Sequence, residues 1–382
     1  MSPSHNIVPY SIVFDAYHLY HLPQFEPLIK LLQADDRFRV ILTSAADNPL
    51  AERQLVAGVL ERFQAETILA PTEPERAARI KALAPDVFVC GWSRYPLPEF
   101  ISDRTLAVML YHGIGVKPSY WRDNHARLDI RFIEGSKRAE QLRRHGVTTE
   151  LAEVGFPKLD PLIRDQANGR PDLAAQLGLD PAKPTVLFAP TFYPSSLEPL
   201  VRLLGPQTED YNLILKLHQW AHFDKRFSGL KLGRQVTLAE KLAASYGHVH
   251  LLGPEQYNII PYLLLADVLL TEASSTIYEM LAIGKPVVVN RFYRLRWSHR
   301  LTRSRLFKRR LDAEMNRDLS AICYELRRPE DLGSILHEAL QGNNPFREAQ
   351  QSAVAELLGN LDGHASARVR DTLLEHLERR AT

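Results

Sequence analysis

Residues 266–279 read Ala-Asp-Val-Leu-Leu-Thr-Glu-Ala-Ser-Ser-Thr-Ile-Tyr-Glu, and this stretch decides the fold that we predict. A short apolar run, typical of a strand buried on both faces, leads directly into a segment that we expect to be helical. Ser274, Ser275 and Thr276 stand at the helix start, where free N–H groups and the helix dipole favour an anion. Capping needs one such hydroxyl, so three together predict a phosphate site, with simple capping as the alternative.

Glu279 lies one helical turn after Ser275 and should face the same side as the three hydroxyls. A carboxylate at this place is suited to accept hydrogen bonds from two ribose hydroxyls. The alternative is an acid that stabilises the helix dipole.

The alternation of short apolar runs with helix-like segments extends over the rest of the chain. It predicts parallel strands joined by helices, in two series separated by a Pro- and Gly-rich linker at 166–184. The fold class that we predict is α/β, with two Rossmann-like domains whose parallel sheets face a central cleft. We expect an acceptor domain at 1–168, a nucleotide-donor domain at 182–345 and C-terminal helices at 346–382. The strand-like runs are 11–14, 38–42, 67–69, 87–90, 106–111, 130–133 and 151–154, then 185–188, 213–217, 249–252, 268–271 and 286–289.

The composition is that of a water-soluble protein in a reducing compartment. The 382 residues carry a net charge of +2, and the two cysteines, Cys90 and Cys323, supply neither a disulfide framework nor a zinc site. No apolar window is long enough to span a membrane, and no leader precedes the first apolar run. There is no Asp-x-Asp triplet, so we expect neither a catalytic metal nor a resident cofactor, the activated nucleotide being a substrate.

Polar residues also follow the run at 106–111. His112 stands at its end, where an imidazole can take a proton from a hydroxyl, and Gly113 permits a tight turn near Lys117. We assign His112 a catalytic role and place Gly113 and Lys117 in the acceptor loop. A histidine that only closes a loop is the alternative.

Two more strand ends point to a donor phosphate. Thr191 follows the run at 185–188, and Lys216 and His218 share one side of the next strand by period-two alternation. A cation and an imidazole projecting together suit a pyrophosphate whose charge grows as a bond breaks. The alternatives are an ordinary turn at Thr191 and a surface lysine beside a packed histidine.

Taken in order, these motifs resemble the CDP-glycerol glycerophosphotransferase family of teichoic-acid and capsule synthesis. The matching segments are Tyr111–Gly113 with Lys117, Gly155–Asp160, Ala189–Thr191, Lys216–His218, Ser274–Ser275 and Asp362–Val369. The resemblance implies a GT-B fold and a CDP-glycerol donor. It implies that His112 is the base toward the acceptor hydroxyl, that His218 assists the donor phosphate, and that Ser274 and Ser275 contact phosphate.

Some residues depart from the family pattern. Glu272-Ala273 stands where the family usually has Asp-Tyr, and Gln219-Trp220 stands where a proline is usually near. Thr276 and Glu279 are more like GT-B enzymes that use nucleotide sugars. A sugar-nucleotide donor therefore stays open.

Residues 291–310 contain nine Lys or Arg residues and no acidic residue, with aromatic residues between them. Such a segment suits an anionic membrane surface or an anionic acceptor, and no nucleic-acid-binding module accompanies it. A solvated helix face is the alternative. The residues that we assign to this contact are Arg291, Arg294, Arg296, Trp297, Arg300 and Arg303.

Together these features predict an enzyme that moves a polyol phosphate, glycerol phosphate first among them, from a CDP-activated donor to a hydroxyl of a membrane-linked glycan or polymer, releasing CMP. We expect a cytoplasmic protein, peripheral on the inner face of the membrane, whose partners are the donor and a lipid-linked acceptor and not nucleic acid. Closure of the cleft would align the reactants. The alternatives are a GT-B glycosyltransferase and a non-catalytic protein that binds anionic polymer or membrane.

Overall fold

The computed structural model describes residues 8–92, 96–114, 119–122, 124–166, 171–223, 232–301 and 318–381. The chain forms two compact units. Unit 1 comprises Met1–Gly113, Tyr120–Asp160 and Leu357–Thr382, and unit 2 comprises Ile114–Ser119 and Pro161–Glu356. The boundary thus falls at residue 160 and not in the predicted linker, and the last helix belongs to the unit that contains the N-terminal strands.

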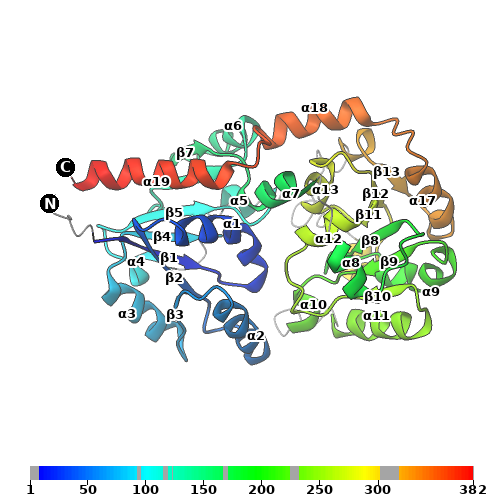
Figure 1. The fold of residues 1–382 in the computed structure, drawn as a ribbon, viewed down its shortest axis with the longest axis horizontal. Coiled ribbons are helices and arrows are strands. Elements are labelled where there is room, and N and C mark those ends of the chain that lie inside the picture. The colour runs from blue at the N-terminus through cyan, green and yellow to red at the C-terminus, as the bar shows by residue number, and fades with distance from the viewer. Residues whose placement is uncertain are drawn as a thin grey trace. The chain divides into compact units, whose positions relative to one another are not determined.

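Unit 1 is built on a parallel sheet of seven strands in the order β3-β2-β1-β4-β5-β6-β7 (Figure 1). Its central strands are buried along their length, as expected for a sheet covered on both faces. Helices α1 and α19 pack together on one side of this sheet, and α3 and α4 pack together on the other. The strands are β1 (Tyr10–Asp15), β2 (Phe38–Thr43), β3 (Glu66–Ile68), β4 (Val87–Cys90), β5 (Leu106–Leu110), β6 (Ile130–Ile133) and β7 (Glu150–Glu153). The helices are α1 (Leu22–Gln33), α2 (Leu50–Glu61), α3 (Glu73–Leu83), α4 (Leu97–Phe100), α5 (Ser119–Arg122), α6 (Ser136–Arg144) and α19 (Ala365–Ala381), with short 3-10 turns at Leu19–His21 and Pro157–Leu159.

Unit 2 repeats this plan with six parallel strands in the order β10-β9-β8-β11-β12-β13. Helices α9 and α11 pack against each other in this unit. The strands are β8 (Thr185–Ala189), β9 (Asn212–Leu215), β10 (Val249–Leu251), β11 (Val268–Thr271), β12 (Val287–Asn290) and β13 (Tyr324–Leu326). The helices are α7 (Asp160–Asp165), α8 (Pro171–Leu177), α9 (Leu197–Gln207), α10 (Trp220–Phe223), α11 (Gly233–Ser245), α12 (Ile260–Leu265), α13 (Thr276–Leu281), α14 (Trp297–Leu301), α17 (Leu332–Leu340) and α18 (Arg347–Leu358), with 3-10 turns at Leu319–Ala321 and Pro329–Asp331.

Both sheets have the strand order of a Rossmann fold, and the order reverses between β1 and β4 in unit 1 and between β8 and β11 in unit 2. Ligands of such sheets bind beyond the carboxyl ends of the strands on either side of that reversal. The residues that follow β1, β4, β8 and β11 are therefore the first place to look for a site.

The prediction of two parallel α/β domains is confirmed, and each predicted strand is present within a few residues of its expected bounds. Strand β13 was not predicted, because three residues with a central glutamate leave no apolar run to detect. Helix α8 lies inside the segment predicted as a linker, since seven helical residues start directly at Pro171. The two predicted C-terminal helices are α18 and α19.

Helix α19 is fastened to unit 1 by two segments that the sequence singled out as motifs. The buried Asp160 carboxylate accepts hydrogen bonds from the backbone N–H groups of Ala365 and Ser366, at 3.0 and 2.8 Å, and so caps the helix start. Arg368 donates to the carbonyl of Val154 at 2.8 Å. Gly155 has φ of +87°, and a Cβ there would lie 3.2 Å from the Arg368 guanidinium. These motifs therefore hold the fold together in this chain.

Among the residues that the structure describes, no helix is both long and apolar enough to cross a membrane.

Candidate active site

The predicted base, His112, lies two residues beyond β5 in unit 1. Its Nδ1 is 3.0 Å from the carbonyl oxygen of Gly91, which follows the neighbouring strand β4. A carbonyl oxygen only accepts hydrogen bonds, so Nδ1 carries the proton of this contact. In the neutral ring Nε2 then holds the lone pair. This is the tautomer that a general base toward a hydroxyl needs. Gly113 follows His112 at the end of the unit 1 segment, and Lys117 lies outside the described residues.

Sequence reasoning missed two histidines that follow β1 and lie beside His112. The rings of His21 and His112 have centroids 4.5 Å apart, and those of His18 and His21 are 5.8 Å apart. His18 and His21 are both buried, and Trp92 after β4 contacts them both. Both histidines could have been found by examining the residues just past each strand, as was done for His112. The segment Tyr17–His21 begins two residues after the end of β1.

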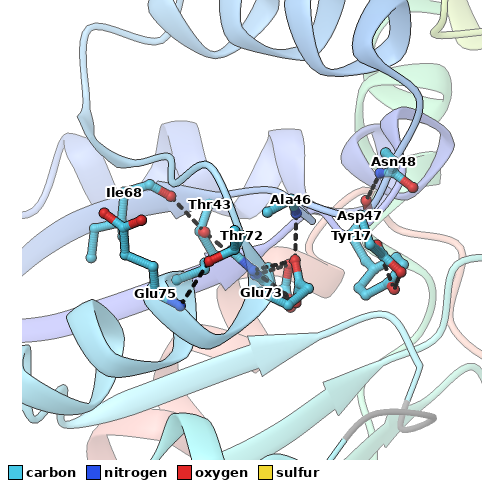
Figure 2. A network of polar contacts seen from close by, with 11 residues as sticks. Tyr17, Thr43, Ala46, Asp47, Asn48, Ile68, Thr72, Glu73 and Glu75 are labelled. Carbon is cyan, nitrogen blue, oxygen red and sulfur yellow. Dashed lines mark hydrogen bonds and ion pairs between the residues drawn. The ribbon is translucent and has the colours of Figure 1, made fainter.

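The carboxylate of Glu52 and the loop that follows β2 make hydrogen bonds with residues of the histidine segment. Glu52 of α2 lies 3.1 Å from Nδ1 of His18, and both side chains are buried. Figure 2 shows how the loop after β2 is held: the Tyr17 hydroxyl meets both carboxylate oxygens of Asp47 at 2.9 Å, and the Asn48 amide donates to the Tyr17 carbonyl at 2.6 Å. The loop also donates from the Ala46 N–H to Glu73 of α3. Residues after β1, β2, β4 and β5 thus gather at one edge of the unit 1 sheet.

In unit 2 the first predicted donor-binding residue, Thr191, is held by a buried carboxylate. Glu272, directly after β11, accepts hydrogen bonds from the backbone N–H of Thr191 at 2.5 Å and of Ser196 at 2.7 Å, and from the Ser196 hydroxyl. The Glu272 side chain is 1% exposed, and burial raises its pKa to about 7 despite these hydrogen bonds. Glu272 was noted in the sequence only as a departure from a family pattern. Its contacts show that it joins the segment after β8 to the end of β11.

His218 lies near the same edge, after β9, packed between aromatic rings. Its ring centroid is 5.0 Å from that of Phe192 and 5.6 Å from that of Trp220. The backbone N–H of Trp220 donates to Nδ1 of His218 at 3.2 Å. Because a backbone N–H only donates, Nδ1 is the unprotonated nitrogen and Nε2 carries the proton. Nε2 of His218 is therefore a hydrogen-bond donor, whereas Nε2 of His112 is a hydrogen-bond acceptor.

Lys216 and His218 both follow β9 and do not lie within it. Strand β9 ends at Leu215, so the period-two pattern no longer applies to the residues beyond it. The Lys216 side chain is buried, and its ammonium group donates to the carbonyl of Gln256.

The hydroxyl residues at the start of α13 are accessible. Ser274, Ser275 and Thr276 are half-buried, and the Thr276 hydroxyl donates to the Ser274 hydroxyl at 3.1 Å. Ser275 makes no side-chain capping bond, whereas the Ser274 hydroxyl accepts a hydrogen bond from the Thr276 backbone N–H at 3.4 Å and so caps the helix start. Ala273, next to Ser274, packs against the cluster that contains Phe192, and the ring of Phe192 also contacts His218. Glu279, in contrast, is fully buried inside unit 2.

The basic segment is only partly available for an external partner. Arg291 pairs with Glu325 and Arg294 with Glu198, so these two charges are used within unit 2. Arg296 lies over the ring of Tyr193, and Arg300 donates to the carbonyl of Leu295 at 3.1 Å. Trp297 and Leu301 of α14 are 72% and 73% exposed. Arg303 lies outside the described residues.

No group of three or more His, Cys, Asp or Glu side chains that could hold a metal ion occurs in the parts of the chain that the structure describes.

Comparison with protein families identifies the chain. Residues 136–374, more than half of its length, match the model of the CDP-Glycerol:Poly(glycerophosphate) glycerophosphotransferase family. The chain belongs to this family. The matched range includes His218, the serine pair and Asp160, whereas His112 precedes it. The family resemblance predicted from the motifs is confirmed, and the protein is a CDP-glycerol glycerophosphotransferase-like transferase.

Solved structures of other proteins share the fold of this chain. A histidine variant of the wall teichoic acid polymerase TagF, soaked with CDPG, is 16% identical with a TM-score of 0.67, over 98% of this chain and 90% of that one. A putative UDP-N-acetylglucosamine 2-epimerase from Listeria monocytogenes is 14% identical with a TM-score of 0.60, over 98% of both chains. The UDP-GlcNAc 2-epimerase from Neisseria meningitidis is 13% identical with a TM-score of 0.59, over 96% of this chain and all of that one. These likenesses establish the GT-B fold. The sequence comparison with curated proteins gives no significant match.

Proposed function

We propose that this transferase moves glycerol phosphate from CDP-glycerol to a hydroxyl of a membrane-linked glycan or polymer and releases CMP. Family membership supports the polyol-phosphate transfer. The acceptor, the released nucleotide and the membrane linkage are the parts that the proposal adds.

The observation that carries the proposal is the opposite polarity of the two histidines. Gly91 offers a carbonyl to Nδ1 of His112, and Trp220 offers an N–H to Nδ1 of His218. The first contact makes Nε2 a proton acceptor and the second makes Nε2 a proton donor. A phosphoryl transfer to a hydroxyl needs one group of each kind: a base for the nucleophile and a hydrogen-bond donor for the phosphate oxygens.

In the reaction that we propose, Nε2 of His112 takes the proton of the acceptor hydroxyl. The acceptor oxygen forms a bond to the phosphorus that carries the glycerol, and the bond from this phosphorus to the bridging oxygen breaks. The bridging oxygen leaves with CMP. Nε2–H of His218 and the hydroxyls of Ser274 to Thr276 donate hydrogen bonds to the phosphate oxygens, where negative charge grows.

Contact with a membrane-linked acceptor is assigned to α14. Its Trp297 and Leu301 expose apolar surface within a basic segment, a composition suited to an anionic interface. We place the protein in the cytoplasm, peripheral on the inner face of the membrane. Arg296, Arg300 and Arg303 carry the positive charge of this contact, since Arg291 and Arg294 are paired within unit 2.

The test is a donor panel with one lipid-phosphate acceptor. CDP-glycerol, CDP-ribitol, UDP-N-acetylglucosamine and a GDP-sugar are incubated with the full-length protein, and the released nucleotide is measured. We expect CMP from CDP-glycerol, and loss of this release in His112→Ala and in His218→Ala, with His145→Ala as an exposed histidine control.

Two outcomes would contradict the proposal. Release of UDP or GDP, and not CMP, would establish the glycosyltransferase alternative. Binding of anionic polymer without any nucleotide release, unchanged in both histidine variants, would establish the non-catalytic alternative.

A further inference from the structure

We propose that His21 is a positioning residue for His112, and that Gly91 is a glycine because both imidazoles meet over its backbone. This inference rests on the function proposed above, in which His112 is the base. Neither His21 nor Gly91 belongs to the motifs by which the family is matched, since both lie before residue 136.

The first step of the argument is the meeting point itself. The carbonyl oxygen of Gly91 contacts Nδ1 of His112 at 3.0 Å. A Cβ at Gly91 would lie 3.3 Å from both Cγ and Nδ1 of His21, a separation tighter than most Cβ contacts. The same residue therefore fixes one imidazole through its carbonyl and makes room for the other by lacking a side chain.

The second step concerns the ring contact. The ring centroids of His21 and His112 are 4.5 Å apart and their planes are tilted by 31°, so the two rings are in direct contact. Tyr20 contacts both rings edge-on, at 4.5 Å from His21 and 5.5 Å from His112. The ring of Tyr120 lies 5.8 Å from that of His112. His112 is thus confined between aromatic rings while its Nδ1 keeps the contact with Gly91.

The third step is the rigidity of His21. Its side chain is completely buried, and it is bounded by Trp92 at 5.1 Å and by His18 at 5.8 Å between ring centroids. His18 is held in turn by the buried Glu52 carboxylate at 3.1 Å. His21 can therefore restrict the movement of the His112 ring, because its own ring is held in place by the packing of Trp92 and His18.

A base works only if its lone pair points at the hydroxyl, and small displacements of a catalytic group can lower the rate on the order of 100-fold. His21 touches the ring of His112 but not, in this proposal, the reacting atoms. Its effect should consequently appear in kcat and in the tautomer of His112, and leave the KM for the donor little changed.

The experiment uses His21→Ala, which removes the ring that contacts His112, and Gly91→Ala, which places a methyl group against His21 without removing any polar group. His21→Phe keeps an aromatic ring at this place and is the matched control. Kinetics are measured for each variant alone and in the His112→Ala background, with His145→Ala as the control in the same unit. In parallel, proton–nitrogen correlation spectra of protein labelled with 15N-histidine report which nitrogen of His112 is protonated, the His112→Ala protein identifying its signals.

We expect His21→Ala and Gly91→Ala each to lower kcat by at least about 10-fold, and to have no further effect once His112 is alanine. His21→Phe should retain more activity than His21→Ala, because it keeps the ring. We expect the His112 signals to change from the single Nδ1–H tautomer toward a mixture. Unchanged His112 signals with unchanged kcat, or equal losses with and without His112, would overturn the inference. Absence of nucleotide release by the unaltered protein with every donor would instead refute the proposed function, while the spectra still decide the role of His21.

Discussion

The carboxyl edges of the two sheets have the same strand order but opposite chemistry. The edge of unit 1 carries imidazoles and aromatic rings, and the Glu52 carboxylate contacts His18. The edge of unit 2 carries hydroxyl residues, and its buried carboxylate, Glu272, holds backbone N–H groups. One edge is suited to accept a proton and the other to donate hydrogen bonds to phosphate. The difference arises from which backbone group faces each histidine, a carbonyl for His112 and an N–H for His218.

The largest expected effect comes from removing either histidine. General acid–base groups contribute about 10² to 10⁴-fold, so we expect His112→Ala and His218→Ala each to lower kcat within that range. Steady-state CMP release measures the effect, and thermal unfolding verifies that the variants fold.

The comparison becomes sharper with the conservative variants. His218→Gln keeps an N–H donor and should retain more activity than His112→Gln, which offers no basic nitrogen. Equal losses in the two glutamine variants would mean that the two histidines do not differ in role.

The second largest effect is expected from replacing Glu272, and it concerns the free energy of unfolding. Truncation to alanine leaves the N–H groups of Thr191 and Ser196 without their acceptor in a buried place, at about 1–3 kcal/mol for each unsatisfied group. We expect Glu272→Ala to lower the free energy of unfolding by several kcal/mol and to raise the KM for the donor. Chemical denaturation and donor titration measure the two quantities. An unchanged KM for the donor would mean that Glu272 does not contribute to donor binding.

The pH dependence of this carboxyl group has a definite sign. Its pKa is raised from 4.5 to about 7 in the folded protein, so the folded state keeps a proton that the unfolded state has lost. The corresponding stability is present below about pH 4.5 and is lost as the pH rises through 7, up to about 3 kcal/mol. The unfolding free energy of the unaltered protein should therefore fall relative to that of Glu272→Gln over this range. Parallel curves for the two proteins between pH 5 and 8 would contradict it.

A smaller effect is expected from the cap of α19. Asp160→Ala removes the acceptor of two backbone N–H groups at the helix start, and loss of such a cap costs about 0.5–2 kcal/mol. Asp160→Asn retains one acceptor oxygen. Its free energy of unfolding should lie between that of the unaltered protein and that of Asp160→Ala. Hydrogen exchange of the α19 amides reports whether the loss is local to this helix.

The smallest expected effect is that of Trp297→Ala. Because the Trp297 side chain is 72% exposed, the free energy of unfolding should change by less than about 0.5 kcal/mol. Binding to vesicles containing anionic lipid should weaken, while CMP release with a water-soluble acceptor stays the same. Unaltered vesicle binding would remove α14 from the proposed membrane contact.

Local pattern sufficed for most strands of both units. The segments Val87–Cys90, Ile130–Ile133 and Val268–Thr271 are strands with the predicted bounds. A short, mainly apolar run between turn signals is typical of a buried strand. Ser274 to Thr276 lie at a helix start for the same reason, since strand and helix are both encoded within 14 residues. Where the pattern was short, at β13, the strand was not predicted, and β9 ended before Lys216.

The sequence by itself determined that the chain is a two-sheet α/β protein with polar strand ends, because periodicity and turn residues act over a few neighbours. Only the tertiary structure decided which nitrogen of His112 and His218 carries a proton, that His21 lies against His112, that Glu272 binds the segment after β8, and that Asp160 caps a helix more than 200 residues away. The contacts of His112 with Gly91 and of Glu272 with Thr191 depend on which strands are neighbours in a sheet. That adjacency is set by the packing of the whole unit, and no local pattern records it.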